Sequence, residues 1–491
     1  MIVRRFMSAR VLLVLGLLSG CAPSSDGFGG NDFGEGTSGG PTGGVMTTAP
    51  PASGDNSSGE SDSSETEGPG TGGMETGTGS GESTGELPGF EKGPGLYVSA
   101  ASGADSNDGS REAPMRSIQW ALQEAESQGL PAVYVAQGLY TATHDDLASI
   151  ELRPGVSLYG GFSASSWDER DPGLYPTEVI DESIATTGVS DLLPHHAVYA
   201  PAGVFEDVVV DGFTITASDA GYASAILVEG GSPTLSGNTF LGRAGASVTM
   251  AVRINGGRPV FTDNTIDPVG AISSSTGVRC DMGQPEFLRN DIHSGDTGTT
   301  YAVLYDVCDG SLVNNVIRSE RSATATSYAV QLYDSSPDIL SNSIASEPDD
   351  GYTSYHTYIS GSSTPRIDNN NFVQVSDLGE VYCVYASGGA QPSSMRNNNL
   401  DCSQIYYGTL SATTLLELEA NLATATDNIV VETAVMDAVS GDLRLRDDGS
   451  VPCTLARGGL DLSDAVDQDR SGTARSIPWS IGAYELDGEC Q

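Results

Sequence analysis

The chain has 491 residues and carries 65 acidic against 22 basic residues, so its formal net charge at pH 7 is −43. Nucleic acid binding needs a cationic surface that neutralises phosphates, and this composition excludes that class of partner. So acidic a surface favours solubility outside the cell and a capacity for divalent cations.

The first 21 residues predict an export signal. Three arginines precede an apolar run over 11–18 that is too short to span a bilayer. The segment ends in Leu18-Ser-Gly-Cys21, which resembles the bacterial lipobox and implies a lipid chain on Cys21. A cysteine with several acyl chains is a durable membrane anchor, whereas a soluble secreted protein cleaved elsewhere is the alternative. We expect an extracytoplasmic lipoprotein, and Ala22 after the cysteine favours the outer membrane or cell surface.

Residues 22–93 consist mostly of Gly, Ser, Thr, Glu and Pro. Such a segment cannot bury enough apolar surface to offset the entropy of ordering. We therefore expect a disordered linker that holds the folded part away from the membrane.

The folded part begins near residue 94, and its first feature is a predicted helix from Pro114 to about Gln128. Proline opens it, apolar residues share one face, and Gly129 ends it. Apolar runs at 132–135, 156–162 and 208–215 then read as short strands.

A short sequence motif that ends in asparagine recurs from about residue 223 onward. Ser232-Pro-Thr-Leu-Ser-Gly-Asn238 returns as a similar phrase ending at Asn264 and again at Asn290. Weaker copies follow at a nearly constant interval. The recurring asparagines are Asn238, Asn264, Asn290, Asn315, Asn342, Asn370 and Asn398.

A period in the twenties without helical heptads indicates a solenoid in which each repeat is one coil. Alternating apolar runs such as Ala225–Val228 and Ala251–Ile254 would stack as parallel strands about 4.8 Å apart. The predicted fold is all-β, a single-stranded right-handed parallel β-helix over 94–410. An N-terminal helix caps it, and 411–491 supply the last coils and a closing segment. We expect the asparagines to form a ladder, each taking the left-handed bend between strands.

The opening and closing segments resemble a known family. Leu96-Tyr-Val-Ser, Asp105-Ser-Asn-Asp-Gly109 and Ala113-Pro-Met-Arg-Ser-Ile resemble the start of DUF1565-type, pectin-lyase-like β-helix proteins of bacterial surfaces. Ile481-Gly-Ala-Tyr-Glu485 resembles the segment that closes such proteins. The resemblance implies an architecture but not an activity, because this fold hosts lyases, hydrolases, adhesins and spacers.

Six cysteines remain besides Cys21, and an even number in an exported chain favours disulfides. Fifteen pairings are possible. Neighbours on adjacent coils or in the closing segment would pair as Cys280–Cys308, Cys383–Cys402 and Cys453–Cys490. The cysteine spacing does not indicate a zinc site.

The residues between the inward-facing valines should form one outer face. As a ligand-binding face we predict Glu229, Arg253, Asn255, Gln331 and Tyr333. Arg279, Asp281 and Asp306 share that face and are the catalytic candidates, since adjacent coils bring the two acids within about 5 Å at the backbone. Such a pair could hold calcium beside an arginine base, as in uronate lyases, or serve glycoside hydrolysis. The alternative, which we favour, is that these acids form a ladder of solvated ion pairs with Arg253 and Arg279 and have no catalytic role.

Two acidic loops suggest calcium as the only cofactor. Asp467, Asp469 and Ser471 match the first half of an EF-type loop, but Pro478 stands where its bidentate Glu would fall. Asp105 and Asn107 form a similar, shorter pattern, and either loop could be a turn without metal.

Taken together, these features predict a monomeric, lipid-anchored β-helix with a binding or structural role toward extracellular polysaccharide or another surface protein. An extracellular lyase or glycoside hydrolase acting on uronic-acid-containing polymers is the alternative function. Edge-to-edge assembly of coils is a third possibility.

Overall fold

The structure is a computed structural model that describes residues 92–491, except 143–147, 183–194, 220, 245, 297, 321–325, 348–351, 377, 410 and 487. The predicted signal, Cys21 and almost all of the 22–93 linker lie outside the described residues. Within the described part, no helix combines the length and the apolar character needed to cross a membrane.

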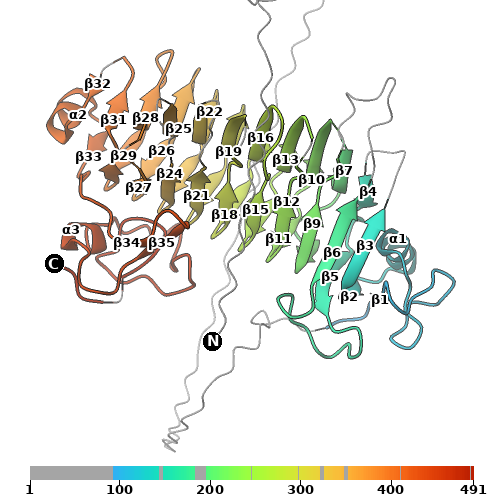
Figure 1. The fold of residues 1–491 in the computed structure, drawn as a ribbon. Coiled ribbons are helices and arrows are strands. Elements are labelled where there is room, and N and C mark those ends of the chain that lie inside the picture. The colour runs from blue at the N-terminus through green and yellow to red at the C-terminus, as the bar shows by residue number, and fades with distance from the viewer. Residues whose placement is uncertain are drawn as a thin grey trace, which may run out of the picture. The chain divides into compact units, whose positions relative to one another are not determined.

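The body is a parallel β-helix of three sheets, as predicted, and successive coils contribute one strand to each sheet (Figure 1). Sheet A consists of β1 (Leu96–Val98), β2 (Ala132–Ala136), β5 (Ser157–Phe162), β8 (Val209–Asp211), β11 (Thr234–Ser236), β14 (Val260–Thr262), β17 (Glu286–Leu288), β20 (Ser311–Val313), β23 (Asp338–Leu340), β26 (Arg366–Asp368), β29 (Ser394–Arg396) and β33 (Ala425–Thr426). Sheet B consists of β3 (Gly138–Ala142), β6 (Thr177–Asp181), β9 (Phe213–Thr216), β12 (Thr239–Leu241), β15 (Thr265–Asp267), β18 (Asp291–His293), β21 (Val316–Ser319), β24 (Ser343–Ser346), β27 (Asn371–Gln374) and β30 (Asn399–Asp401).

Sheet C has the longest strands and carries the outer face considered below. It consists of β4 (Ala148–Glu151), β7 (His195–Pro201), β10 (Tyr222–Glu229), β13 (Val248–Asn255), β16 (Ser274–Cys280), β19 (Thr299–Asp306), β22 (Ser327–Tyr333), β25 (Thr353–Ser360), β28 (Glu380–Ala386), β31 (Gln404–Tyr407) and β32 (Ser411–Ala412). All its pairings are parallel except that of β31 with β32.

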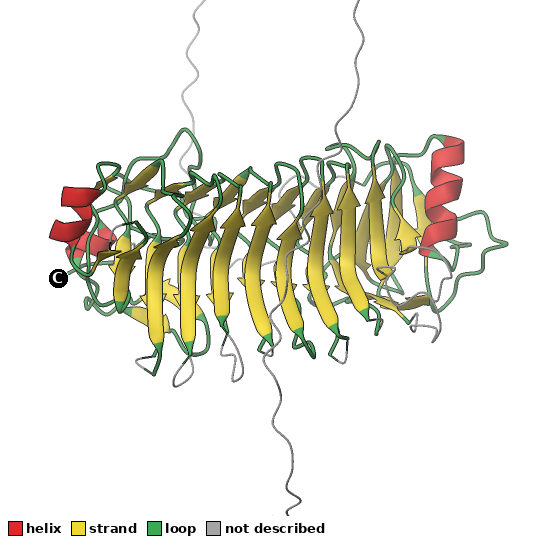
Figure 2. Ribbon diagram, turned by 90° about the horizontal axis from the view of Figure 1, so that it is seen from above, coloured by secondary structure: helices red, strands yellow, loops and turns green. Residues whose placement is uncertain are grey.

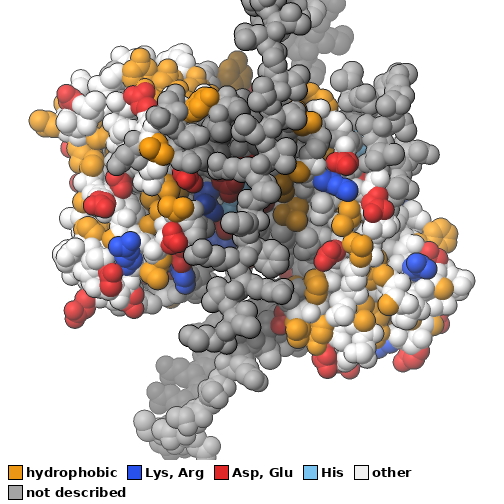
Figure 3. Space-filling view, viewed as in Figure 1, with side chains coloured by type: hydrophobic (Ala, Val, Ile, Leu, Met, Phe, Trp, Pro, Cys, Tyr) orange, Lys and Arg blue, Asp and Glu red, His pale blue; other side chains and the backbone are white. Residues whose placement is uncertain are grey.

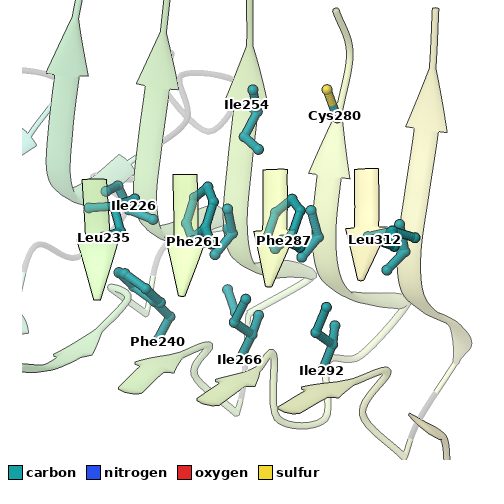
Figure 4. Packing of buried hydrophobic residues seen from close by; sticks show 14 of the residues in the cluster. Ile226, Leu235, Phe240, Ile254, Phe261, Ile266, Cys280, Phe287, Ile292 and Leu312 are labelled. Atoms are coloured by element: carbon teal, nitrogen blue, oxygen red, sulfur yellow. The ribbon is translucent and has the colours of Figure 1, made fainter. Parts of the chain in front are cut away.

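The core is a set of inward rows in strict register. In sheet C, Val252 pairs with Val278 and Val278 with Val303, and all three are fully buried. In sheet A, Phe261 stacks on Phe287 with ring centroids 4.5 Å apart. Figure 4 shows the side chains of all three sheets converging on one interior. The alternation of the strands thus places one side of each sheet in the core and the other outside.

The asparagine ladder lies at the corner between sheets A and B. Each Oδ1 accepts from the backbone N–H and Nδ2 of the asparagine one coil earlier, as Asn264 does from Asn238 at 2.9 and 3.2 Å. The ladder runs one coil beyond the expected seven, because Asn428 accepts from Asn398. The left-handed bend expected of these asparagines falls instead on the residue before each one. These preceding residues are Gly237, Asp263, Arg289, Asn314, Ser341, Asn369, Asn397 and Asp427.

Helices close both ends of the solenoid, and Figure 2 shows the rows of strands between them. Helix α1 (Ile118–Gln128) buries Ile118, Ala121, Leu122 and Ala125 against the first coils and ends at Gly129. It begins later than Pro114, because Ser117 has extended backbone there and serves as the N-cap. Helix α2 (Leu415–Asn421) starts with a Thr414–Glu417 capping box and buries Leu418 against the last coils.

The chain after α2 turns back along the outside of the solenoid. Its elements are β34 (Val435–Asp437), β35 (Asp442–Leu445) and α3 (Cys453–Ala456). Leu443 and Ile481 pack in a cluster with Val316 of sheet B, and Trp479 packs in a cluster with Leu340 of sheet A. After residue 410, β32, β33, Asn428 and Ile429 still pair with the last coils, and most of the remaining chain forms a lateral cover.

The six cysteines form Cys280–Cys308, Cys383–Cys402 and Cys453–Cys490, which confirms the predicted pairing. The first two link strands or turns of neighbouring coils, and the third ties α3 to the end of the chain. Acidic and basic side chains are interspersed with apolar ones over the uncovered part of the surface in Figure 3.

Candidate functional site

The outer face of sheet C carries two rows of tyrosines. Outward positions recur at the same place in each strand, so identical residues on successive coils become direct neighbours. The first row lies on β19, β22, β25 and β28, and the second on β25, β28 and β31. We call the two rows the tyrosine face, made of Tyr301, Tyr328, Tyr355 and Tyr382 in the first row and Tyr358, Tyr385 and Tyr407 in the second.

The rings within each row stack on one another. Centroid distances along the first row are 5.1, 5.1 and 5.3 Å, and along the second 5.0 and 4.9 Å. These values follow the spacing of neighbouring strands, about 4.8 Å. Interplanar angles within the rows stay at 22° or below.

Rings of different rows meet edge to face. Tyr355 and Tyr385, on adjacent strands, have centroids 5.2 Å apart and an interplanar angle of 80°. Tyr328 with Tyr358 and Tyr382 with Tyr407 repeat this contact at 88° and 77°. Both arrangements are favourable for aromatic pairs, so the rows brace each other in a herringbone pattern.

The phenol groups of the first row stay protonated well above neutral pH, because burial raises the pKa of each. Burial, with neighbouring phenols, raises the pKa of Tyr328 to about 12. Burial, with the hydrogen bond to Glu380, likewise raises the pKa of Tyr382 to about 12. A protonated phenol can both donate and accept a hydrogen bond, so the rows combine apolar ring surface with polar tips.

A hollow of about 500 Å³ opens in sheet C next to Tyr301. Its walls are apolar side chains with two guanidinium groups, those of the register partners Arg253 and Arg279. The full lining is Tyr222, Val248, Met250, Arg253, Ser274, Thr276, Arg279, Tyr301 and Leu304.

Of the catalytic candidates, Arg279 lines this hollow and is paired with Asp281. Arg279 donates from Nε to Oδ1 of Asp281 at 2.7 Å, and Nη2 of Arg253 lies 3.5 Å from Oδ2. The hydrogen bond to Asp281, and then the charge of Asp306, raise the pKa of Arg279. Asp281 is therefore held between two guanidinium groups, an arrangement that stabilises an ion-pair cluster and engages both oxygens of the acid.

The other predicted face residues also lie on sheet C. Glu229 accepts a hydrogen bond from the Tyr199 hydroxyl at 2.6 Å and is the register partner of Asn255. Gln331 pairs with Tyr358 in the second row, and Tyr333 is the register partner of Asp306 and 49% exposed.

Sequence reasoning placed its candidate residues on the outer face of sheet C, but it did not include the two tyrosine rows. The sequence does contain a signal for the first row. Its four tyrosines follow one another at a constant interval along the chain, at Tyr301, Tyr328, Tyr355 and Tyr382.

One carboxylate in each predicted calcium loop, Asp469 and Asp105, is engaged by protein donors, whereas Asp467 is exposed. Asp469 Oδ1 accepts from the backbone N–H of Ser471 and Thr473, both at 2.8 Å, and Oδ2 from that of Glu485 at 2.9 Å.

Asp105 accepts from the backbone N–H of Arg116 and Ser117 and from the Ser117 hydroxyl. Asn107 donates to the Pro114 carbonyl. Both loops thus have the bonding of structural turns that fix the chain around them.

Among the residues that the structure describes, one histidine–cysteine group has metal-ligand proximity, namely His356, Cys383 and Cys402. The two sulfurs form a disulfide and cannot act as thiolates. His356 Nε2 lies 3.2 Å from the Val373 carbonyl, and burial lowers its pKa to about 3. The group is part of the neutral interior.

Residues 101–294 match the model of a family described as "Protein of unknown function (DUF1565)", which confirms the resemblance of the opening segment. No curated protein gives a significant match.

Solved structures similar to this chain include a mutant tailspike protein of E. coli bacteriophage HK620 in complex with a pentasaccharide (12% identity, TM-score 0.31) and a GH136 lacto-N-biosidase from Eubacterium ramulus (9% identity, TM-score 0.22). Each comparison covers 65% of this chain and 64% of the other, so the chain spans less than two thirds of either protein. Both likenesses are distant and concern only the fold.

Proposed function

We propose that this chain, a parallel β-helix with a DUF1565-type segment, binds an extracellular carbohydrate chain on the tyrosine face without transforming it. The observation that carries the proposal is the pair of tyrosine rows on five successive strands of one outer face. Contiguous aromatic surface marks an interaction site, and protonated phenols suit a ligand rich in hydroxyl groups.

The regularity of the face favours a carbohydrate over a protein partner. Protein interfaces concentrate their affinity in a few anchors within well-packed central pockets. Here the same side chain recurs at nearly constant spacing along the solenoid, which suits a ligand that itself repeats.

We also propose that the protein is exported and held at the outer membrane or cell surface through a lipid on Cys21, with 22–93 as its tether. Three disulfides support an extracytoplasmic location, because such bonds persist in oxidising compartments. In this arrangement the monomeric β-helix presents its tyrosine face to polymers outside the cell.

A lyase or hydrolase remains the second candidate function, and the hollow beside Arg279 is the observation that favours it. The pairing of Asp281 with two arginines weighs against a free catalytic acid at that place.

The test is glycan binding by the full-length protein in detergent, using affinity electrophoresis on a panel of neutral and acidic polysaccharides. Replacing Tyr355 and Tyr385 by Ser should weaken binding at least about tenfold, because stacked rings contribute the contact area. Trp120→Ala is the control, since Trp120 is 52% exposed on α1 and lies off the face. Retention of full binding by the double variant would refute the proposal.

The same samples decide between binding and catalysis. Each bound polymer is assayed for new reducing ends and for the absorbance of unsaturated sugars. We expect neither product, and appearance of either one would assign the face to an enzyme.

A further inference from the structure

Building on the proposed function, we infer the class of carbohydrate from the geometry of the face. The ligand is an extended β-1,4-linked chain of pyranosides that lies parallel to the solenoid axis, with one sugar over each coil. Glucans, mannans and polymers of N-acetylglucosamine with this linkage belong to the class.

The first step is the spacing of the rows. Ring centroids repeat every 4.9–5.3 Å over five strands, and the repeat is set by the backbone hydrogen bonding of sheet C. A polymer that meets equivalent tyrosines at every coil must advance by the same distance per unit. A clearly different advance accumulates an error with each unit and takes the later sugars out of register with the tyrosines.

The linkage follows from this requirement. In an extended β-1,4-linked chain both bonds to each ring are equatorial, so the polymer is straight and advances per sugar by nearly one coil spacing. Chains linked α-1,4 or β-1,3 wind into helices and curve away from a straight row. The spacing of the tyrosines therefore selects the straight chain.

The second step is the presence of two rows. Successive sugars of an extended β-1,4 chain are turned over relative to one another, so their polar edges point alternately to opposite sides. On the tyrosine face, ring planes of the two rows are nearly perpendicular, as for Tyr355 and Tyr385 at 80°. The rows overlap on β25 and β28, so a chain on this face meets phenols of both rows there, and each phenol can donate and accept a hydrogen bond.

The third step is length. The tyrosine face begins at Tyr301 on β19 and ends at Tyr407 on β31, so it spans five strands. Contacts should accumulate with each added sugar until the chain covers the face, at about five sugars. Longer chains gain only from the hollow beyond Tyr301.

The test is calorimetric titration of the full-length protein with cello-, manno- and chito-oligosaccharides of two to six sugars. Malto- and laminari-oligosaccharides of the same lengths provide the mismatched linkages. In at least one β-1,4 series, Kd should fall about tenfold or more from two to five sugars and change less than about twofold from five to six. The α-1,4 and β-1,3 series should show no comparable gain.

Equal length dependence in the α-1,4 series, or no length dependence in any β-1,4 series, would overturn the inference. The proposed function would survive that outcome if bound polymers still depended on Tyr355 and Tyr385. Failure of every polysaccharide to bind would instead refute the proposed function itself.

A position-dependent variant pair sharpens the test. Tyr355→Ser interrupts the first row in its middle, whereas Tyr301→Ser shortens it at one end. The middle variant should lose more affinity for the five-sugar ligand than the end variant. Tyr355→Phe keeps the stack if the serine variant fails to fold, and circular dichroism checks each protein. Equal losses at the two positions would contradict binding in register along the row.

Discussion

Asn342 illustrates what one side chain contributes to this solenoid. Its Oδ1 accepts from the backbone N–H and Nδ2 of Asn315, while its Nδ2 donates to Leu312 and to Asn370. The residue is fully buried, so none of these bonds can be replaced by water. The recurring asparagine is thus the hydrogen-bonding partner that each corner needs.

Asn342→Ala should destabilise the protein by about 2–5 kcal/mol, because it leaves buried donors of Asn315 and a carbonyl unpaired. Chemical denaturation followed by circular dichroism measures the change. The control is Asn421→Ala, because Asn421 is exposed at the end of α2 and should cost less than about 1 kcal/mol. A loss as small as the control's would show that the ladder is not stabilising.

His293 makes stability depend on pH. Burial by itself lowers its pKa, but the bonds to Asp291 at 3.2 Å and Glu320 at 2.8 Å outweigh burial and raise the pKa to about 10. A raised folded-state pKa gives stability that is complete below the unfolded value of 6.5 and is lost as pH rises toward 10.

We expect Tm of the wild type to fall between pH 6.5 and pH 10, and His293→Gln to flatten that decline. Differential scanning calorimetry at intervals of pH measures both proteins. The charges of Arg318 and Arg470 also lower the pKa of Asp291. Arg318→Gln is therefore the control, because it removes one of these charges and keeps His293. An unchanged slope in His293→Gln would rule out this histidine as the origin.

At the scale of elements, regular patterns were predictable and long-range contacts were not. The inward valines and the ladder follow from the asparagine repeat and the alternation inside it. Two of the disulfides join neighbouring coils, whereas the third was expected from the nearness of its cysteines in the closing segment. The closing segment has no repeat, and its contacts join residues as distant as Leu443 and Val316. The tyrosine rows repeat as clearly as the valines, but the outer face was read from Gln331 and Tyr333 on β22 and not from Tyr328 on the same strand.

The closing segment is held by one buried arginine. Arg475 donates to Asn314 of the solenoid at 2.7 Å and pairs with Glu485 at 3.1 Å, with both side chains of the ion pair almost wholly buried. Burial lowers the pKa of Arg475 and raises that of Glu485, so each charge depends on the other.

Arg475→Met should destabilise the closing segment by about 3–5 kcal/mol, because Glu485 is left buried without its partner. Loosening should expose Val316, Ala345 and Val373 of sheet B and increase binding of an apolar dye. Arg444→Met is the control, since that arginine pairs with Asp442 at the surface. Dye binding at the wild-type level would contradict this role.

At the scale of the whole molecule, both ends of the described body are closed. Helix α1 buries Ile118, Leu122 and two alanines against the first coils, and α2 buries Leu418 against the last coils. We propose that these caps oppose edge-to-edge assembly, so that the β-helix is a monomer.

Leu418→Asp should therefore produce oligomers or aggregates, because a charge in place of the buried leucine detaches α2 and bares the last coil. Light scattering at several protein concentrations measures the change. Leu416→Asp on the same helix is the matched control, since Leu416 is 80% exposed and should leave a monomer. Oligomers in the control, or a monomer in both, would contradict the capping role.

The register of the coils has a consequence for how such a protein can change over time. Thr239 pairs with Thr265, and Thr265 with Asp291, so each coil presents equivalent strand positions to the next. Duplication or loss of one coil in a gene would therefore keep the ladder and the inward rows in register. The tyrosine face would then lengthen or shorten by one coil. The length of polymer that the protein contacts would therefore change over evolution in steps of one coil.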